Sequence, residues 1–176
     1  FEDEASNVFE DPRLSSVIRE LVALVGGRYR WTKESAFHFE PGHYEEKSDP
    51  NKSQSQSAKR YQDSTVTRFV SKQGQSISSA MTAEGYRKIG VLHRLLCNGA
   101  INPGKTGVLL WDEPEANLNP RLMKEVVQAL LELSRNGQQI VLATHDYVLL
   151  KWFDLLKKDG KEDHIRFHVL ARDEET

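Results

Sequence analysis

The chain has a single cysteine, Cys97, among its 176 residues, so it cannot form an internal disulfide bond. It also lacks any run of about 18 apolar residues, the length that a membrane-spanning helix requires. Neither sign of charge prevails, because 24 Lys and Arg residues and 26 Asp and Glu residues leave a net charge of -2. The sequence therefore predicts no disulfide scaffold, no membrane span and no strongly basic surface for nucleic acid. The single cysteine favours the reducing cytoplasm as the location of the protein.

The composition is otherwise that of an ordinary globular domain, with 38% hydrophobic and 28% charged residues. A chain of 176 residues is long enough for roughly one domain with its own core. It begins at Phe1 rather than at methionine and shows no signal-peptide pattern, so we expect it to be part of a longer protein.

Apolar residues recur at helical spacing in several segments, and capping residues mark where these segments begin and end. Asp11 with Pro12, and Asn119 with Pro120, each combine a capping side chain with a proline suited to the first helical turn. The predicted helices cover residues 12–25, 82–97, 120–136 and 147–157.

Short strands are predicted in the N-terminal half of the chain. Tyr29–Trp31 and Ala36–Phe39 form an expected hairpin, and Thr65–Val70 alternates as a strand does. Between them, residues 45–64 contain Ala58 as their single aliphatic residue, which predicts a flexible loop.

In the C-terminal half, strands alternate with helices, the order that produces a parallel sheet with right-handed crossovers. Val108–Trp111 and Ile140–Ala143 are continuous apolar runs, as expected of strands buried on both faces, and Ile165–Leu170 is the last predicted strand. The expected fold class is therefore α/β, with a parallel sheet flanked by helices and a small β-containing insertion.

Residues Gly99–Thr106 read GAINPGKT, which satisfies the phosphate-loop pattern GxxxxGK[ST]. That loop cradles phosphate where it joins a strand to the N-terminus of a helix, because backbone N–H groups converge there. Here a predicted helix precedes the pattern, and the strand at Val108 follows almost at once. We therefore interpret these residues as a turn and do not assign Lys105 to phosphate.

Two acids end the first buried strand of the C-terminal half, in the run VLLWDEP. Ligands bind at this carboxyl edge in open parallel sheets. An aspartate such as Asp112 can hold magnesium there, and a glutamate such as Glu113 can orient or deprotonate an attacking water. The next strand ends in LATHD, so His145 is expected at the same edge, where its imidazole can donate to a phosphate oxygen. Solvated acids and a surface histidine are the alternative interpretation.

A family resemblance accompanies these motifs. WDEPEANLNP, from Trp111 to Pro120, resembles the Walker B strand and D-loop of ABC-type ATPases, and LATHD resembles their H-loop. MTAEGYRKIGVLHRLL, from Met81 to Leu96, is similar to the degenerate signature helix of RecF-, OLD- and SMC-like members. The three motifs occur in family order, so the resemblance implies a partial P-loop NTPase fold.

The resemblance also implies an ATPase head that uses ATP and Mg²⁺ and sandwiches two ATP molecules between two copies of itself. By this resemblance Asp112 holds magnesium, Glu113 is the general base, and His145 contacts the γ-phosphate. The resemblance implies further nucleotide contacts at the start of the signature helix and in the D-loop: Thr82, Ala83, Glu84, Gly85, Asn117 and Asn119. In the family, the D-loop reaches across the dimer.

The chain departs from the family pattern in two ways. Ala83 stands where the family has serine, so a hydroxyl contact with γ-phosphate depends on Thr82 taking that place, and an ordinary helix cap is an equal alternative. A Walker A loop and a Q-loop are absent from the sequence. We therefore expect residues 1–81 to form a helix with a β arm or lid, and residues 82–176 to form the C-terminal half of an ATPase core.

Three hypotheses of function remain. The first is ATP hydrolysis by a longer protein, in which this chain supplies magnesium-binding, general-base and γ-phosphate-sensing residues but is inactive alone. By analogy, such ATPases serve DNA repair or anti-phage defence, with DNA or a nuclease as partner. The second is a non-catalytic dimerisation or interaction module derived from such an ATPase, and the third is a small-molecule-binding α/β domain.

Overall fold

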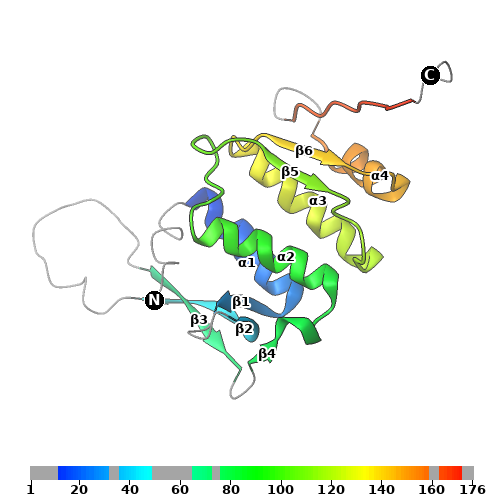
Figure 1. Ribbon diagram of the computed structural model, residues 1–176. Helices are drawn as coiled ribbons and strands as arrows, with labels where there is room; N and C mark the ends of the chain where they lie inside the picture. Colours follow the sequence, from blue (N-terminus) through cyan, green and yellow to red (C-terminus); the bar gives the residue numbers. More distant parts are fainter. Residues whose placement is uncertain (1–11, 32–35, 49–64, 73–75, 159–162, 172–176) are drawn as a thin grey trace, which may run out of the picture.

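The computed structural model describes residues 12–31, 36–48, 65–72, 76–158 and 163–171. Helices α1 (Pro12–Val25) and α2 (Glu84–Cys97) lie in the middle of the molecule, between two groups of elements (Figure 1). A small antiparallel sheet lies on one side of them. On the other side are α3 (Pro120–Arg135), α4 (Tyr147–Leu156) and a pair of parallel strands (Figure 1).

The antiparallel sheet is built around one long strand. Its members are β1 (Gly27–Trp31), β2 (Phe37–Ser48), β3 (Thr65–Ser71) and β4 (Ile77–Ser78). The first part of β2 pairs with β1 and β4, and the second part, from Gly42 on, pairs with β3. A Cβ atom on Gly42 would lie 2.4 Å from the carbonyl oxygen of Val70, so glycine is needed for this close approach. The predicted hairpin and the predicted third strand are both confirmed.

The prediction of a loop over residues 45–64 is wrong for residues 45–48. Glu45 pairs with Arg68 and Ser48 pairs with Thr65, so residues 45–48 continue β2. A polar segment can be a strand when its backbone groups are paired with a neighbour, a condition that hydrophobic content does not reveal. Residues 49–64 lie outside the described part of the chain.

Helix α3 begins and ends where its capping residues predict. Asn119 precedes α3, and its side chain accepts a hydrogen bond from the backbone N–H of Arg121 at 3.0 Å. Gly137 follows the same helix at φ 96°, a conformation that glycine adopts readily. The carboxylate of Asp146 caps α4 in the same way. Asp11, the predicted cap of α1, lies outside the described residues.

One hydrophobic core joins the four helices. Its most deeply buried side chains come from α1, α2, α3 and α4: Val17, Ile18, Ile89, Leu96, Val127, Leu133 and Leu149. The first helix therefore belongs to the same packed unit as the C-terminal helices, while the division of the chain at residue 82 stays a prediction.

The parallel pair consists of β5 (Leu109–Asp112) and β6 (Ile140–Ala143), with α3 as the crossover between them. This arrangement confirms the α/β class. The expectation that both faces are buried is wrong for these strands, because Leu110 is 74% exposed and Val141 is 50% exposed. Alternate side chains, such as Leu109 and Leu142, pack against the core, but within the described residues no second layer covers the other face.

The last predicted strand, Ile165–Leu170, is not formed. Residues 163–171 are described without strand pairing, and Val169 and Leu170 are more than nine-tenths exposed. β-branched residues favour a strand only where a neighbouring strand accepts their backbone hydrogen bonds, and none of the described strands does so here. Among the described residues, no helix has both the length and the apolar character to cross a bilayer.

Candidate active site at the carboxyl edge of the parallel strands

The carboxyl ends of β5 and β6 lie side by side and bring two predicted site residues together. Asp112 is the last residue of β5 and pairs with Ala143, the last residue of β6. The backbone N–H of Glu113 then donates to the carbonyl oxygen of Ala143 at 2.8 Å, which extends the pairing by one residue. As a result, Nδ1 of His145 lies 3.1 Å from Oε1 of Glu113. The juxtaposition expected from the two strand ends is present.

These groups are accessible from solvent. The side chain of His145 is 83% exposed and that of Glu113 is 47% exposed, and Asp112 also lies at the surface. Acids and an imidazole on an open strand edge can meet a ligand without rearrangement of the core. The edge therefore has the access that a nucleotide site needs.

The backbone of Glu113 is held in a conformation that few non-glycine residues adopt. Its φ is 44°, in the left-handed region, which costs about 1 kcal/mol for a residue with a Cβ atom. Its carbonyl oxygen accepts hydrogen bonds from Nζ of Lys88 at 2.9 Å and from the N–H of Ala116 at 3.1 Å. Lys88 belongs to α2, so this helix contacts the acidic strand end directly.

The start of α2 also packs against the loop between β5 and α3. Nδ2 of Asn117 donates to Oε2 of Glu84 at 2.8 Å. A Cβ atom on Gly85 would lie 2.6 Å from the carbonyl oxygen of Asn117 and 2.9 Å from Cα of Leu118. Only glycine permits this contact. The segments that resemble the signature helix and the D-loop therefore lie together in one chain.

Of three other predicted nucleotide contacts, Thr82 and Asn119 have side-chain hydrogen-bond partners within the chain. The hydroxyl of Thr82 accepts a hydrogen bond from the Tyr29 hydroxyl at 2.8 Å and donates to the carbonyl oxygen of Ser79 at 2.7 Å. Ala83 is the N-cap residue of α2 and provides no side-chain cap. Asn119 caps α3. Their roles toward nucleotide stay predictions.

Sequence reasoning missed a hydrogen-bonded pair beside the site, in which the glutamate is buried. Glu115 is 7% exposed, and its Oε1 accepts a hydrogen bond from Oγ1 of Thr144 at 2.5 Å. Within the described residues its second oxygen, Oε2, is buried and meets no hydrogen-bond donor. The sequence offers only a weak signal for this pair. A threonine stands next to the histidine of LATHD, and Glu115 is one more acid, two residues after Glu113.

The residues that match the phosphate-loop pattern lie at the other end of β5. Gly99–Thr106 connects α2 to this strand, and no helix starts within it. The hydroxyl of Thr106 donates to Oε1 of the buried Gln138 at 3.1 Å, and the N–H of Gly104 donates to the carbonyl oxygen of Gly137 at 3.2 Å. The segment is a turn packed on the end of α3, in agreement with its interpretation from sequence.

A family model described as "AAA domain, putative AbiEii toxin, Type IV TA system" matches residues 12–151. This range includes α1 to α3 and every candidate residue described above. The chain belongs to this AAA-domain family. Together with the similarity to ABC transporter ATP-binding proteins, the match confirms the resemblance to ABC-type ATPases that the sequence motifs indicated.

The AAA domain is also similar to ATP-binding subunits of transporters. It is 36% identical over 69 residues to a putative ABC transporter ATP-binding protein of Methanosarcina acetivorans, covering 39% of this chain and 25% of that protein. It is 37% identical over 60 residues to the L-cystine import ATP-binding protein TcyN of Bacillus subtilis, covering 34% and 20%. It is 45% identical over 51 residues to the macrolide export ATP-binding/permease protein MacB of Wolinella succinogenes, covering 29% and 8%. The chain thus spans a quarter or less of these relatives.

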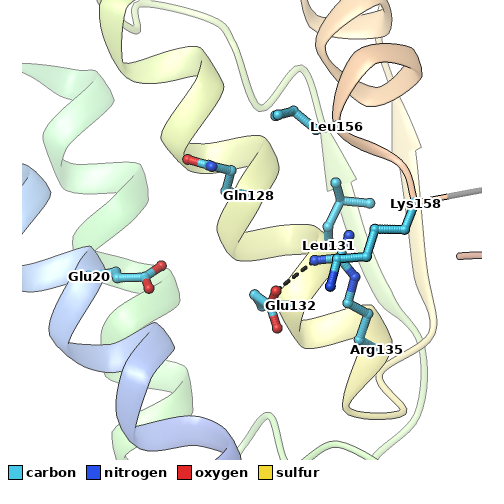
Figure 2. Close-up of a pocket in the computed structure, with 7 residues that line it drawn as sticks. All are labelled: Glu20, Gln128, Leu131, Glu132, Arg135, Leu156 and Lys158. Atoms are coloured by element: carbon cyan, nitrogen blue, oxygen red, sulfur yellow. Dashed lines mark hydrogen bonds and ion pairs between the residues drawn. The ribbon is translucent and has the colours of Figure 1, made fainter. Parts of the chain in front are cut away.

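The AAA domain has a groove that borders the carboxyl edge of the parallel strands and a separate cavity that does not. A groove of about 520 Å³ runs between α2 and β5 and borders the site, since Glu84, Lys88 and Trp111 are among its lining residues. A second cavity, of about 360 Å³, is shown in Figure 2 and is lined by Glu20, Gln128, Leu131, Glu132, Arg135, Leu156 and Lys158. In it Arg135 bonds to Glu132 at 2.6 Å, and none of the strand-edge residues takes part.

The residues of the AAA domain fit magnesium only in combination with a nucleotide. Among the described residues, no group of three or more His, Cys, Asp or Glu side chains is arranged to hold a metal ion. Magnesium in nucleotide sites usually takes one or two carboxylates and completes its shell with phosphate oxygens and water. The exposed Asp112 supplies one such carboxylate.

Proposed function

We propose that this AAA domain takes part in ATP hydrolysis, with Glu113 as general base, His145 as the contact to the γ-phosphate and Asp112 as the magnesium ligand. The observation that carries the proposal is the 3.1 Å contact between Nδ1 of His145 and Oε1 of Glu113 at the edge shared by β5 and β6. The ATP-binding relatives support it.

Each residue contributes a separate part of the chemistry. The carboxylate of Glu113 orients a water molecule and accepts its proton as that water attacks phosphorus. An imidazole with both nitrogens protonated can donate from Nδ1 to Glu113 and from Nε2 to a phosphate oxygen, so His145 can hold base and substrate in register. Magnesium held by Asp112 would neutralise charge on the phosphate oxygens.

Two copies of the domain would share the nucleotides. The residues proposed to contact the ATP of the partner copy lie at the start of α2 and in the loop between β5 and α3: Thr82, Ala83, Glu84, Gly85, Asn117 and Asn119. The proposed setting is a longer cytoplasmic protein in DNA repair or anti-phage defence, with DNA or a nuclease as partner. In this proposal residues 82–176 are the C-terminal half of the ATPase core.

The test is the substitution Glu113→Gln in the complete protein. ATP hydrolysis is expected to fall roughly 100-fold or more, since the amide cannot accept the proton, while ATP stays bound. The matched control is Glu125→Gln, an exposed glutamate on α3, which is expected to hydrolyse ATP at the wild-type rate. Equal rates for wild type and Glu113→Gln would remove Glu113 from the role of base.

A second candidate function is a non-catalytic interaction module. It is favoured by one observation: within the described residues, no glycine-rich loop joins a strand to a helix to hold the α- and β-phosphates. A complete protein that dimerises in sedimentation experiments, but neither binds nor hydrolyses ATP, would establish this alternative.

A further inference from the structure

Glu115 and Thr144 form a partly buried connection next to the two exposed site residues in sequence. Glu115 lies in the loop after β5, and Thr144 is the first residue after β6. The hydroxyl of Thr144 donates to Oε1 of Glu115 at 2.5 Å, across the same two strand ends that carry Glu113 and His145. A carboxylate that is 7% exposed is costly to bury, so its retention calls for a specific partner.

The same hydroxyl holds the backbone on the far side of His145. Oγ1 of Thr144 accepts a hydrogen bond from the N–H of Asp146 at 3.0 Å. The carboxylate of Asp146 in turn accepts from the N–H of Leu149 at 2.8 Å and so caps α4. The residues before and after His145 are therefore both fixed, although the imidazole itself is exposed.

The chemical types of the two side chains determine the direction of these bonds. The single O–H of Thr144 donates to Oε1 of Glu115, which accepts it through a lone pair. The lone pairs of the Thr144 hydroxyl oxygen are then free to accept the hydrogen bond from the N–H of Asp146. This order of donors and acceptors gives the turn around His145 one preferred conformation.

From this geometry we infer that Glu115 is a positioning residue, which acts through Thr144 to hold the imidazole of His145 beside Glu113. The inference rests on the proposed ATPase function for its effect on turnover, but the connection itself can be tested without ATP. Among the described residues, the side chain of Glu115 bonds to Thr144 and not to Glu113 or His145, so we expect its influence on the site to pass through Thr144.

The first measurement is amide hydrogen exchange in the complete protein without nucleotide. Thr144→Val keeps the shape of the side chain and removes the hydroxyl, and Thr144→Ser keeps the hydroxyl. The N–H of Asp146 is expected to exchange roughly fivefold faster in Thr144→Val, the weight of one neutral hydrogen bond, and near the wild-type rate in Thr144→Ser. Unchanged exchange in Thr144→Val overturns the inference.

The second measurement is steady-state ATP hydrolysis. Thr144→Val and Glu115→Ala are expected to lower kcat roughly tenfold and to keep KM for ATP within about twofold of the wild-type value. Thr144→Ser is the control and is expected to have a kcat near that of the wild type. Because Glu115→Ala leaves a cavity and can fail to fold, Thr144→Val is the decisive variant.

A double-mutant cycle separates positioning from general support of the fold. If Thr144 acts through His145, Thr144→Val in a His145→Ala background lowers kcat by less than about twofold. A tenfold loss in that background, or wild-type kcat in Thr144→Val alone, contradicts the inference. If the wild-type protein does not hydrolyse ATP, the proposed function fails, and the exchange rate of the Asp146 amide still decides whether the connection exists.

Discussion

Lys88 has the side chain that links the start of α2 to the acidic strand end. Its ammonium group donates to the carbonyl oxygen of Glu113 at 2.9 Å. The backbone of Glu113 is left-handed at φ 44°, a conformation that persists only where neighbours hold it. The lysine therefore contributes to the direction in which the Glu113 carboxylate points.

Replacing Lys88 by methionine is expected to lower the ATP hydrolysis rate of the complete protein roughly tenfold, with ATP affinity within about twofold. The reason is the loss of a charge-assisted hydrogen bond that favours the left-handed backbone of Glu113. Lys124→Met, on the exposed side of α3, is the matched control and is expected to leave the rate unchanged. A normal rate in Lys88→Met, measured by phosphate release, would show that the other backbone contacts of Glu113 suffice.

At this scale, the sequence predicts residues that end strands but not residues that support them. Asp112, Glu113 and His145 could be placed because the carboxyl ends of parallel strands meet at one edge. Lys88 and Glu115 could not, since their contacts join segments that are distant in the sequence and depend on how α2 and the loop after β5 pack. No periodicity encodes such a contact.

Among the elements, α2 and β2 are connected by a buried polar cluster. Nε2 of His93 lies 3.3 Å from the Tyr44 hydroxyl and 3.5 Å from the sulfur of Cys97. Burial, together with the charges of Arg28 and Arg94, lowers the pKa of His93 to about 4. The imidazole is therefore neutral in the folded protein near neutral pH.

This histidine is expected to make the folded state less stable as the pH falls. Its folded pKa of about 4 lies below the unfolded value of about 6.5, so between these values the unfolded chain binds a proton that the folded chain refuses. The free energy of unfolding should decrease by about 2 kcal/mol from about pH 7.5 to about pH 5. Urea unfolding at the two pH values measures this change.

His93→Asn provides the comparison, because asparagine keeps a polar group and does not titrate. The variant is expected to be less stable at neutral pH but to lose less stability on acidification than the wild-type protein. The carboxyl of Asp163, whose pKa is lowered by Arg135, titrates below this window and does not interfere. Equal pH dependence in both proteins would exclude His93 as its source.

Helices were predicted more closely than strands because helix signals are local. Asn119 and Pro120 mark the start of α3, and Gly137 marks its end. Each of these signals lies within two residues of the helix end that it marks. A strand depends on a partner elsewhere. Residues 45–48 became a strand because β3 pairs with them, and residues 165–170 did not because none of the described strands lies beside them.

For the whole molecule, the carboxyl edge would form only one side of the proposed nucleotide site. In the proposed site, Asp112, Glu113 and His145 would face the γ-phosphate, and two of these residues are acids, like the triphosphate itself. The GAINPGKT turn lies at the opposite end of β5, where it is packed on the end of α3. Under the proposed function, the described residues would thus supply groups for hydrolysis but little that attracts ATP.

The 176-residue chain alone is therefore expected to bind MgATP weakly, with a dissociation constant above about 1 mM in calorimetry. Lys105→Ala is expected to leave this weak binding unchanged, because Lys105 precedes a strand rather than a helix and lies away from the strand edge. Micromolar binding that is lost in Lys105→Ala and kept in Lys124→Ala would instead make Gly99–Thr106 a phosphate loop. In that case the turn must rearrange to expose its N–H groups, since the N–H of Gly104 is bonded to Gly137 and the hydroxyl of Thr106 to Gln138.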